Sequence, residues 1–485
     1  MAATSLSANA TGALRQAGAF ASDLLRPSIR LGVTGLARSG KTIFISALIH
    51  NLIAGGRLPF LRAQAEGRLH RAWLEPQPDD DVPRFQIEGH LRELTASPPQ
   101  WPESTRRISQ LRLTLDYAPA SLWRHVTGSR RLHVDIVDYP GEWLLDLPLL
   151  ARGFRDWSQT TLAAANRPDR AKAAGPFVQF LTTLAGNSAD PEQTALAGAS
   201  LYRGYLALCR KADNVYSGMT PGRFLMPGDL EGSPALTFFP LPSELADDGP
   251  LSTLLARRFE AYKTYVVKPF FRDHFSRLDR QIVIVDALGA LDAGPSAVAD
   301  LSASLDSVLT AFRPGTNTWL SSILSRRIDR ILFAASKADH LHHTSHDRLE
   351  AILGRMVNGA VTRAQFAGAE VRVLAMAGIR ATREAEVAAS AGATPLPCII
   401  GTPLAGEVFG AQTFDGKREA VIFPGDLPAD PALALDSAGS GLSGTLRFPR
   451  LRPPALSVAA AAPVPPFPHI RLDRAIDFLI GDRLA

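Results

Sequence analysis

The sequence is poor in cysteine, in long apolar runs and in charge of one sign. Only two of its 485 residues are cysteine, Cys209 and Cys398, and their wide separation argues against a disulfide framework or a zinc knuckle. No apolar stretch approaches the roughly 20 residues of a membrane-spanning helix, and the N-terminus lacks the apolar core of a secretory signal. The 52 Lys and Arg nearly balance the 47 Asp and Glu, and no nucleic-acid motif occurs. These absences predict a cytoplasmic protein without a transmembrane segment or a nucleic-acid partner.

The stretch GLARSGKT, residues 35–42, matches the phosphate-loop pattern G-x-x-x-x-G-K-[ST]. A strand-like run precedes it, and residues 41–53 follow with apolar side chains at helical spacing, so that a helix N-terminus can offer its free N–H groups to phosphate. Lys41 is expected to reach the β- and γ-phosphate oxygens, and the Thr42 hydroxyl is expected to ligate Mg²⁺. The nucleotide-binding residues predicted in this segment are Gly35, Ala37, Arg38, Ser39, Gly40, Lys41, Thr42 and Ile43.

Two D-x-x-G strings compete for the role of γ-phosphate sensor, Asp138 to Gly141 and Asp286 to Gly289, and each ends a strand-like run. The GTPase order of sensor, plain, base-reading and closing strands maps onto residues 131–138, 281–286, 330–336 and 370–376. This order favours the first string. We therefore expect Asp138 to reach Mg²⁺ through water and the Gly141 N–H to touch the γ-phosphate.

Residues 336–339, SKAD, resemble the [NT]-K-x-D signature of guanine recognition. The Asp339 carboxylate would accept hydrogen bonds from guanine N1–H and the 2-amino group, whereas adenine presents the wrong pattern. Lys337 would lie along the base, and Ser336, in place of the usual Asn or Thr, keeps a hydroxyl that can bridge to the phosphate loop. The other residues expected around the base are His340, Ala377 and Gly378. A solvated turn is the alternative interpretation of SKAD.

Thr105 stands just before a strand at 106–117 that is expected to pair antiparallel with 131–138. It is either a second threonine that closes on Mg²⁺ or an ordinary residue at a strand start. The predicted metal ligands are Thr42, Thr105 and Asp138, and the predicted catalytic residues are Lys41, Thr42, Thr105, Asp138, Gly141 and Glu142. Two other functions stay open: a P-loop ATPase or kinase without guanine selectivity, and a non-catalytic scaffold that keeps nucleotide bound.

From about residue 28 to the C-terminus, these motifs resemble the YcjX family of stress-associated bacterial P-loop GTPases, and the string DYPGEWLLDLPLL at 138–150 is the most specific of them. The resemblance implies binding of GTP and GDP with Mg²⁺ and slow GTP hydrolysis. It also implies a role in the phage-shock or heat-shock response, a membrane-protein partner and a place peripheral to the inner membrane. Glu142 stands where Ras-like enzymes place a water-orienting Gln, and its negative charge beside a γ-phosphate also predicts slow turnover. Arg38 either points toward the phosphates or faces solvent.

The expected fold class is α/β, a Ras-like P-loop NTPase sheet with a large, mostly helical insertion and a C-terminal extension. The predicted parts are an N-terminal tail or short helix at 1–27, a GTPase domain at 28–150 and 277–390, an insertion at 151–276 and an extension at 391–485. Helical periodicity occurs at 191–212 and at 251–275, where Pro269 would kink or end the helix. Because the insertion occupies the place of a switch helix, it would form the surface for a protein effector.

The extension and one histidine-rich stretch carry further expectations. Asp415-Gly416 predicts a β-hairpin turn, residues 426–468 read as a Pro/Ala-rich linker, and a helix is expected from Asp473 to Arg483. The stretch HLHHTSHD at 340–347 brings four histidines together, but their spacing fits no common metal site. Thr344 and Asp347 within it predict a helix capping box instead.

Overall fold

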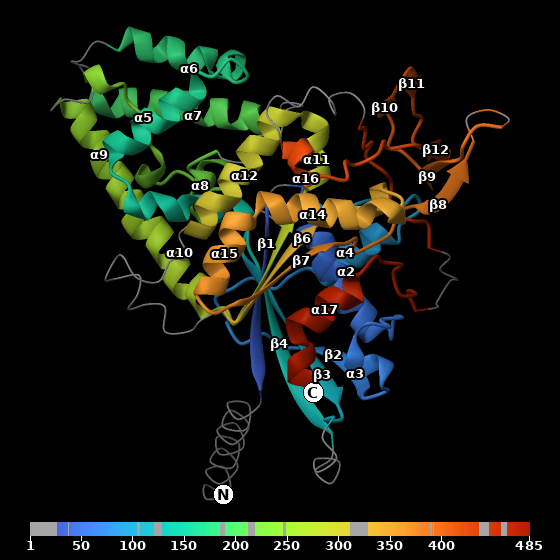
Figure 1. The fold of residues 1–485 in the computed structure, drawn as a ribbon. Helices are drawn as coiled ribbons and strands as arrows, with labels where there is room; N and C mark the ends of the chain where they lie inside the picture. The colour runs from blue at the N-terminus through green and yellow to red at the C-terminus, as the bar shows by residue number, and fades with distance from the viewer. Residues whose placement is uncertain are drawn as a thin grey trace, which may run out of the picture.

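The computed structural model describes residues 27–36, 38–103, 107–120, 129–184, 190–211, 219–245, 249–310, 328–388, 390, 392–435, 446–456 and 463–485. A seven-stranded sheet in the order β2-β3-β4-β1-β5-β6-β7 forms its centre (Figure 1). The strands are β1 Ser28–Gly35, β2 Leu69–Glu75, β3 Ser109–Tyr117, β4 Arg130–Asp138, β5 Arg280–Val285, β6 Arg330–Ala335 and β7 Glu370–Ala375. The strands from β4 to β7 in this order run parallel, and β3 and β2 extend one edge by antiparallel pairing. The predicted α/β class and the predicted order of strands are confirmed.

Both faces of the sheet are covered, because alternate residues of its central strands point into different cores. Ile282 and Ile284 of β5 join a core with α2 (Lys41–Ile53), α4 (Ile87–Leu94) and α17 (Leu472–Ile480). Val283 and Val285 join a second core with α11 (Ala287–Ala293), α12 (Pro295–Thr310), α14 (His346–Met356) and α15 (Asn358–Phe366). Burial on both faces explains why these parallel strands read as nearly continuous apolar runs.

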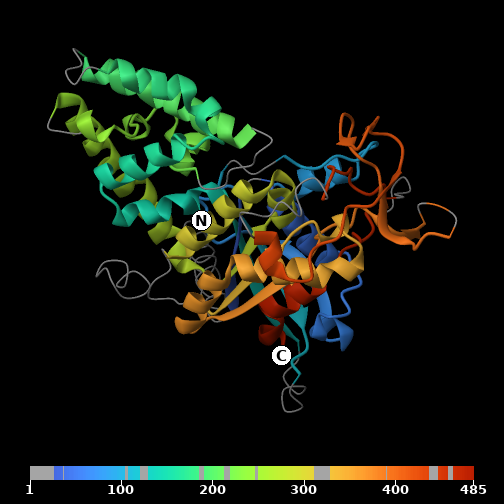
Figure 2. The ribbon, with the colours of Figure 1, turned by 45° about the horizontal axis from the view of Figure 1, so that its top comes forward.

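Between β4 and β5 the chain forms a separate group of helices, which we call the helical lobe (residues 141–277). It lies to one side of the sheet in both ribbon views (Figures 1 and 2). Its elements are η2 Gly141–Ala151, α5 Phe154–Ala165, α6 Ala171–Thr183, α7 Pro191–Lys211, α8 Gly222–Leu225, η3 Gly228–Leu230, η4 Pro234–Leu236, η5 Ser243–Leu245, α9 Pro250–Tyr262, η6 Lys263–Val267, α10 Lys268–Asp273 and η7 Phe275–Arg277. Stacked and edge-to-face rings, among them Trp157, Tyr202, Phe238 and Phe259, fill its own core.

The long helix expected at 251–275 has an irregular turn before its proline. A π-helical turn, Lys263–Val267, joins α9 to α10 without a break, and Pro269 is the second residue of α10. The irregularity therefore precedes Pro269.

Residues 383–485, here called the C-terminal segments, return to the sheet. Strands β8 (Arg383–Val387), β9 (Leu396–Gly401) and β12 (Ala420–Ile422) form an antiparallel sheet in the order β12-β9-β8. The chain then continues through α16 (Pro431–Leu435) to α17 and η10 (Gly481–Leu484). The terminal helix was predicted at this position. In the described residues no helix has the length and apolarity needed to cross a bilayer.

The predicted hairpin at Asp415-Gly416 is wrong. The hairpin strands are β10 (Val408–Phe409) and β11 (Gln412–Thr413), so the turn lies at residues 410–411, and β12 pairs with β9 instead. Asp415 Oδ1 accepts hydrogen bonds from the backbone N–H groups of Lys417 and Arg418, a local turn that needs no strand pairing.

Candidate nucleotide-binding site

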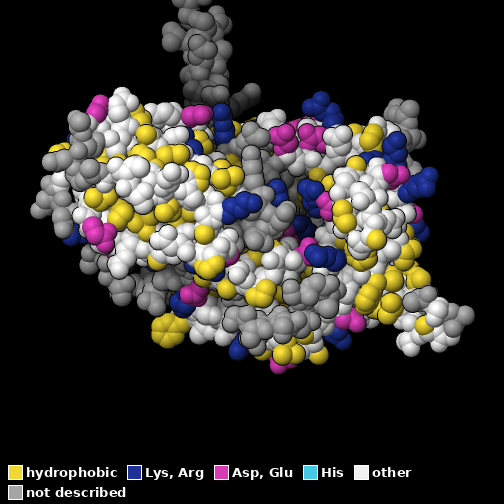
Figure 3. Space-filling model, turned by 90° about the horizontal axis from the view of Figure 1, so that it is seen from above, with side chains coloured by type: hydrophobic (Ala, Val, Ile, Leu, Met, Phe, Trp, Pro, Cys, Tyr) yellow, Lys and Arg dark blue, Asp and Glu magenta, His cyan; other side chains and the backbone are white. Residues whose placement is uncertain are grey.

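A cleft of about 340 Å³ opens at the carboxyl ends of β1, β4, β6 and β7. Seen from above, Lys and Arg side chains gather between the helical lobe and the C-terminal segments (Figure 3). The sheet-end segments contribute Gly35, Leu36, Arg38, Ser39, Gly40, Lys41, Thr42, Ile43, Pro140, Glu142, Ser336, Lys337, Asp339, His340, Ala377, Gly378 and Ile379. The structure thus brings together most of the residues that the motifs singled out, whereas the predicted residues Asp138 and Gly141 are not among those that line the cleft. Ala37 and Thr105 lie outside the described residues.

The loop between β1 and α2 is shaped by close backbone approach. Gly40 has φ 86°, a left-handed conformation that favours glycine, and it is the N-cap of α2. A Cβ at Gly35 would lie 2.6 Å from the Ile284 carbonyl oxygen, and a Cβ at Gly141 would collide with the Gly35 carbonyl. The chain at Gly141, just after β4, therefore packs directly against the end of β1. The first turn of α2 faces the cleft.

Lys41 and Asp138 form an ion pair at the base of the cleft, with Nζ 2.5 Å from Oδ1. The pairing follows from the sheet, since β1 and β4 are parallel neighbours and both end at this edge. The two residues are 8% and 1% exposed. Such a pair holds only because each charge compensates the other away from water.

The second D-x-x-G string has a different environment. Asp286 is the N-cap of α11, where its Oδ1 accepts a hydrogen bond from the Gly289 N–H at 3.0 Å. Its other oxygen pairs with the Lys337 ammonium. Asp286 thus caps α11 and pairs with Lys337.

Asp339 is buried and held by the segment that follows β7. Its Oδ2 accepts a hydrogen bond from the Ala381 N–H at 2.9 Å, and its carbonyl oxygen accepts one from the Thr382 hydroxyl at 2.6 Å. Across the described chain, Oδ1 of Asp339 has no such partner. The carboxylate is therefore fixed in place with one oxygen still able to accept.

The neighbouring loop residues are placed as follows. Lys337 adopts φ 61°, and the Ser336 hydroxyl donates to the Val285 carbonyl at 3.2 Å instead of reaching the phosphate loop. Burial lowers the pKa of His340, which lines the cleft as a neutral ring. Gly378 allows close packing on α2, because a Cβ there would lie 3.2 Å from the Phe44 Cα.

Ten cleft residues were not predicted as site residues. Three of them, Leu36, Pro140 and Ile379, lie within or beside the predicted loops, and the other seven come from elsewhere in the chain: Trp101, Pro102, Arg210, Met226, Leu404, Arg450 and Leu451. Arg210 of α7 forms an ion pair with Glu142 at 2.8 Å, and the Trp101 indole N–H donates to the Leu451 carbonyl at 2.6 Å. These contacts join distant segments, so no local pattern in the sequence could have indicated them.

Within the helical lobe, one buried carboxyl links η2, the element that follows β4, to α8 and α9. Oδ2 of Asp146 in η2 accepts a hydrogen bond from the Tyr262 hydroxyl at 2.5 Å, and Oδ1 accepts one from the Gly222 N–H at 2.8 Å. Burial raises the pKa of Asp146 to about 6, although both hydrogen bonds lower it. Strand β4 leads into η2, and buried hydrogen bonds of Asp146 connect η2 to α8 and α9.

The predicted capping box at Thr344 and Asp347 is wrong. Helix α14 begins at His346 after Ser345, and no side chain caps it. The Thr344 hydroxyl instead contacts the His342 ring at 3.0 Å, and Asp347 pairs with Arg471 at 2.6 Å. A local partner for Thr344 and a distant one for Asp347 thus replace the predicted cap.

A family model described as the YcjX-like family, DUF463, matches residues 29–484. This chain belongs to the YcjX-like family. An Escherichia coli (strain K12) protein named Ras-like GTPase YcjX is 37% identical, over 94% of this chain and 96% of its own length. A Shewanella oneidensis (strain MR-1) protein of the same name is 34% identical, over 94% of both chains. The resemblance drawn from the motifs is confirmed for this YcjX-like chain.

Proposed function

We propose that this protein is a Mg²⁺-dependent guanine-nucleotide switch with slow GTP hydrolysis, built as a Ras-like sheet with an inserted helical lobe and a C-terminal extension. The observation that carries the proposal is that two distant motifs meet: Lys41 of the phosphate-loop pattern and Asp339 of the SKAD stretch line the same cleft. The names of the two relatives agree with it. By family resemblance we place the switch in a bacterial stress response, at the cytoplasmic face of the inner membrane.

Phosphate recognition rests on the loop before α2. The free N–H groups of its first turn and the Lys41 ammonium supply the positive potential that a triphosphate requires. Asp138 compensates Lys41 in this structure. A bound phosphate would give Lys41 a second anionic partner.

The donor set also fits Mg²⁺, which prefers oxygen ligands. The Thr42 hydroxyl lines the cleft and the Asp138 carboxylate lies beside Lys41, so both would hold the ion, with Thr105 as the third predicted ligand. Bound Mg²⁺ would neutralise charge on the β- and γ-phosphate oxygens.

Guanine selectivity rests on Asp339. Its Oδ2 is occupied by the Ala381 N–H, which leaves Oδ1 and the second lone pair of Oδ2 to accept from guanine N1–H and the 2-amino group. A site built for two donors rejects adenine, because the carboxylate would lose its hydrogen-bond partners. Lys337 and His340 line the same part of the cleft.

Slow turnover follows from Glu142. It replaces the neutral water-orienting Gln of Ras-like enzymes, and its carboxylate is 7% exposed beside the sensor glycine. The Arg210 pair offsets part of its charge. We infer that Glu142 binds and orients water poorly when a γ-phosphate is present.

Calorimetric titration of the nucleotide-free protein in Mg²⁺ with GDP, a non-hydrolysable GTP analogue and ATP tests the proposal. We expect at least tenfold preference for guanine nucleotides, lost in Asp339→Asn, and loss of all binding in Lys41→Ala. Asp347→Asn is the matched control, since this carboxyl lies near the same loop but outside the cleft. Equal binding of ATP would indicate an ATPase or kinase, and tight GTP binding without turnover would indicate a scaffold.

A further inference from the structure

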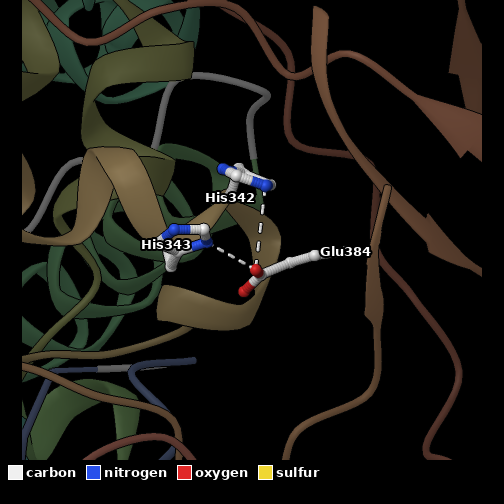
Figure 4. A group of neighbouring side chains, drawn as sticks. All are labelled: His342, His343 and Glu384. Atoms are coloured by element: carbon white, nitrogen blue, oxygen red, sulfur yellow. Dashed lines mark hydrogen bonds and ion pairs between the residues drawn. The ribbon is translucent and has the colours of Figure 1, made fainter. Parts of the chain in front are cut away.

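Two histidines and a glutamate converge where the loop after Asp339 meets strand β8 (Figure 4). Ligand atoms of His342, His343 and Glu384 all lie within 4.8 Å of one another. Nδ1 of His343 is 2.6 Å and Nε2 of His342 is 3.7 Å from the same carboxylate oxygen, Oε2 of Glu384. The side chain of His342 is 6% exposed and that of His343 is 64% exposed, so one ring is fixed and the other is free to adjust.

Outer contacts hold two of the three groups in place. Nδ1 of His342 lies 3.0 Å from the Thr344 hydroxyl, and Oε1 of Glu384 accepts a hydrogen bond from Arg380 at 3.0 Å. In the tautomer whose Nδ1–H donates to Thr344, Nε2 presents a lone pair to the Glu384 carboxylate. A bound cation would satisfy both acceptors in this tautomer. Partners on the far side of a ring or a carboxylate are also what orients metal ligands in proteins.

We propose that His342 Nε2, His343 Nδ1 and Glu384 Oε2 bind one Zn²⁺ ion, with water as the fourth ligand. Two imidazoles and one carboxylate are a donor set that suits zinc, whereas Mg²⁺ and Ca²⁺ prefer oxygen alone. Tetrahedral coordination with bonds near 2.1 Å separates ligand atoms by about 3.4 Å. The 3.7 Å between His342 and Glu384 is close to this spacing, and the two ring nitrogens lie within 4.8 Å of each other. The exposed His343 ring would move away from the carboxylate by about 1 Å and toward His342 to complete the geometry.

Linear spacing could not indicate this site. The histidines are adjacent in the sequence, but the carboxylate comes from another strand, with a separation of 41 residues between His343 and Glu384. The segment that leads into β8 already bonds to Asp339 through Ala381 and Thr382. Zinc would therefore fasten the C-terminal sheet to the loop that carries Asp339.

The test is titration of the untagged full chain with Zn²⁺ by calorimetry, and with Co²⁺ by visible absorption, in excess Mg²⁺ that occupies oxygen sites. We expect one ion per chain and the strong visible bands of four-coordinate Co²⁺. His343→Ala and Glu384→Gln should each lower the affinity for Zn²⁺ more than tenfold, and Thr344→Val about tenfold. His70→Ala, which removes an exposed histidine of β2, should leave it unchanged.

Absence of four-coordinate Co²⁺ bands in the wild type would overturn the proposal. So would an affinity for Zn²⁺ that is the same in His343→Ala, Glu384→Gln and the wild type. Thermal unfolding of each variant without metal tests whether the fold is intact. Because the His343 side chain is exposed, we expect His343→Ala to unfold at the same temperature as the wild type. No nucleotide enters the assay, so its result is independent of guanine binding.

Discussion

Lys41 and Asp138 are an ion pair with almost no access to water. Removing one partner of such a pair leaves the other charge uncompensated, which costs about 3 kcal/mol or more. We expect Asp138→Asn to lower the free energy of unfolding by about that amount, and added Mg²⁺ with GDP to restore part of it, because a bound phosphate would give Lys41 another anionic partner. Chemical denaturation with and without nucleotide measures both effects.

Asp286→Asn is the matched control for this prediction, since Asp286 also ends a strand and carries a D-x-x-G string. Asn also caps a helix, so this substitution removes mainly the partly buried ion pair with Lys337, worth about 1 kcal/mol or less. Equal destabilisation by the two substitutions would contradict the special role of the Lys41 pair.

Asp146 should make stability depend on pH. Because its pKa is raised from near 4 in the unfolded chain to about 6 in the folded protein, the folded state binds the extra proton between these values. The free energy of unfolding should therefore fall as pH rises from about 4 to 6, by about 3 kcal/mol from this group, and then stay level. Denaturant titrations across this range, compared with Asp146→Asn, should show the difference.

A second variant tests whether Asp146 causes the pH dependence of stability. The Tyr262 hydroxyl lowers the pKa of Asp146, so Tyr262→Phe should move the pH window upward, whereas Asp146→Asn should abolish it. If the wild type and Asp146→Asn share one pH profile, Asp146 is not the titrating group.

Residues with a motif could be predicted, and residues without one could not. Lys41, Asp138 and Asp339 were found because each ends or follows a strand at a fixed place in the chain. Arg210 and Arg450 reach the cleft from a helix and a loop whose local sequences resemble any solvated segment. Long-range packing alone brings them to the site.

Helix α7 meets the sensor segment through the Arg210–Glu142 pair. If GTP occupies the cleft, Arg210→Ala should weaken GTP binding relative to GDP on the order of tenfold, because Glu142 is then uncompensated beside the γ-phosphate. Glu142→Gln should shift the same ratio in the opposite direction. Competition binding with both nucleotides gives the ratio, and shifts of equal sign in the two variants would refute a charge effect.

Element prediction was reliable where burial sets the pattern and poor where short strands depend on partners. The parallel strands from β4 to β7 were found because buried strands are continuous apolar runs. Strands β10, β11 and β12 have two or three residues each, so pairing across the chain decides their register more than their own sequences do. The wrong hairpin has this cause.

The last helix, α17, packs on the central sheet and makes hydrogen bonds with it. Arg280 of β5, in the middle of the sheet, donates to the Leu479 carbonyl at 2.6 Å and pairs with Asp329 and Asp482. Leu479→Ala, at a fully buried position of α17, should lower the free energy of unfolding by about 3 kcal/mol. Calorimetry should show the sheet melting earlier, and Leu433→Ala, on the exposed side of α16, should change stability by less than about 0.5 kcal/mol.

The position of α17 also has a consequence for synthesis in the cell. Helix α17 packs on β5 and β6, yet it is made about 187 residues after β5 ends (472 − 285). At a ribosomal rate of about 5 to 20 residues per second, the part of the sheet that α17 covers stays exposed for roughly 9 to 37 s. Throughout this interval the nascent chain displays an unprotected apolar surface, so we expect holding chaperones to capture arrested chains that end before α17 and to release chains that include it.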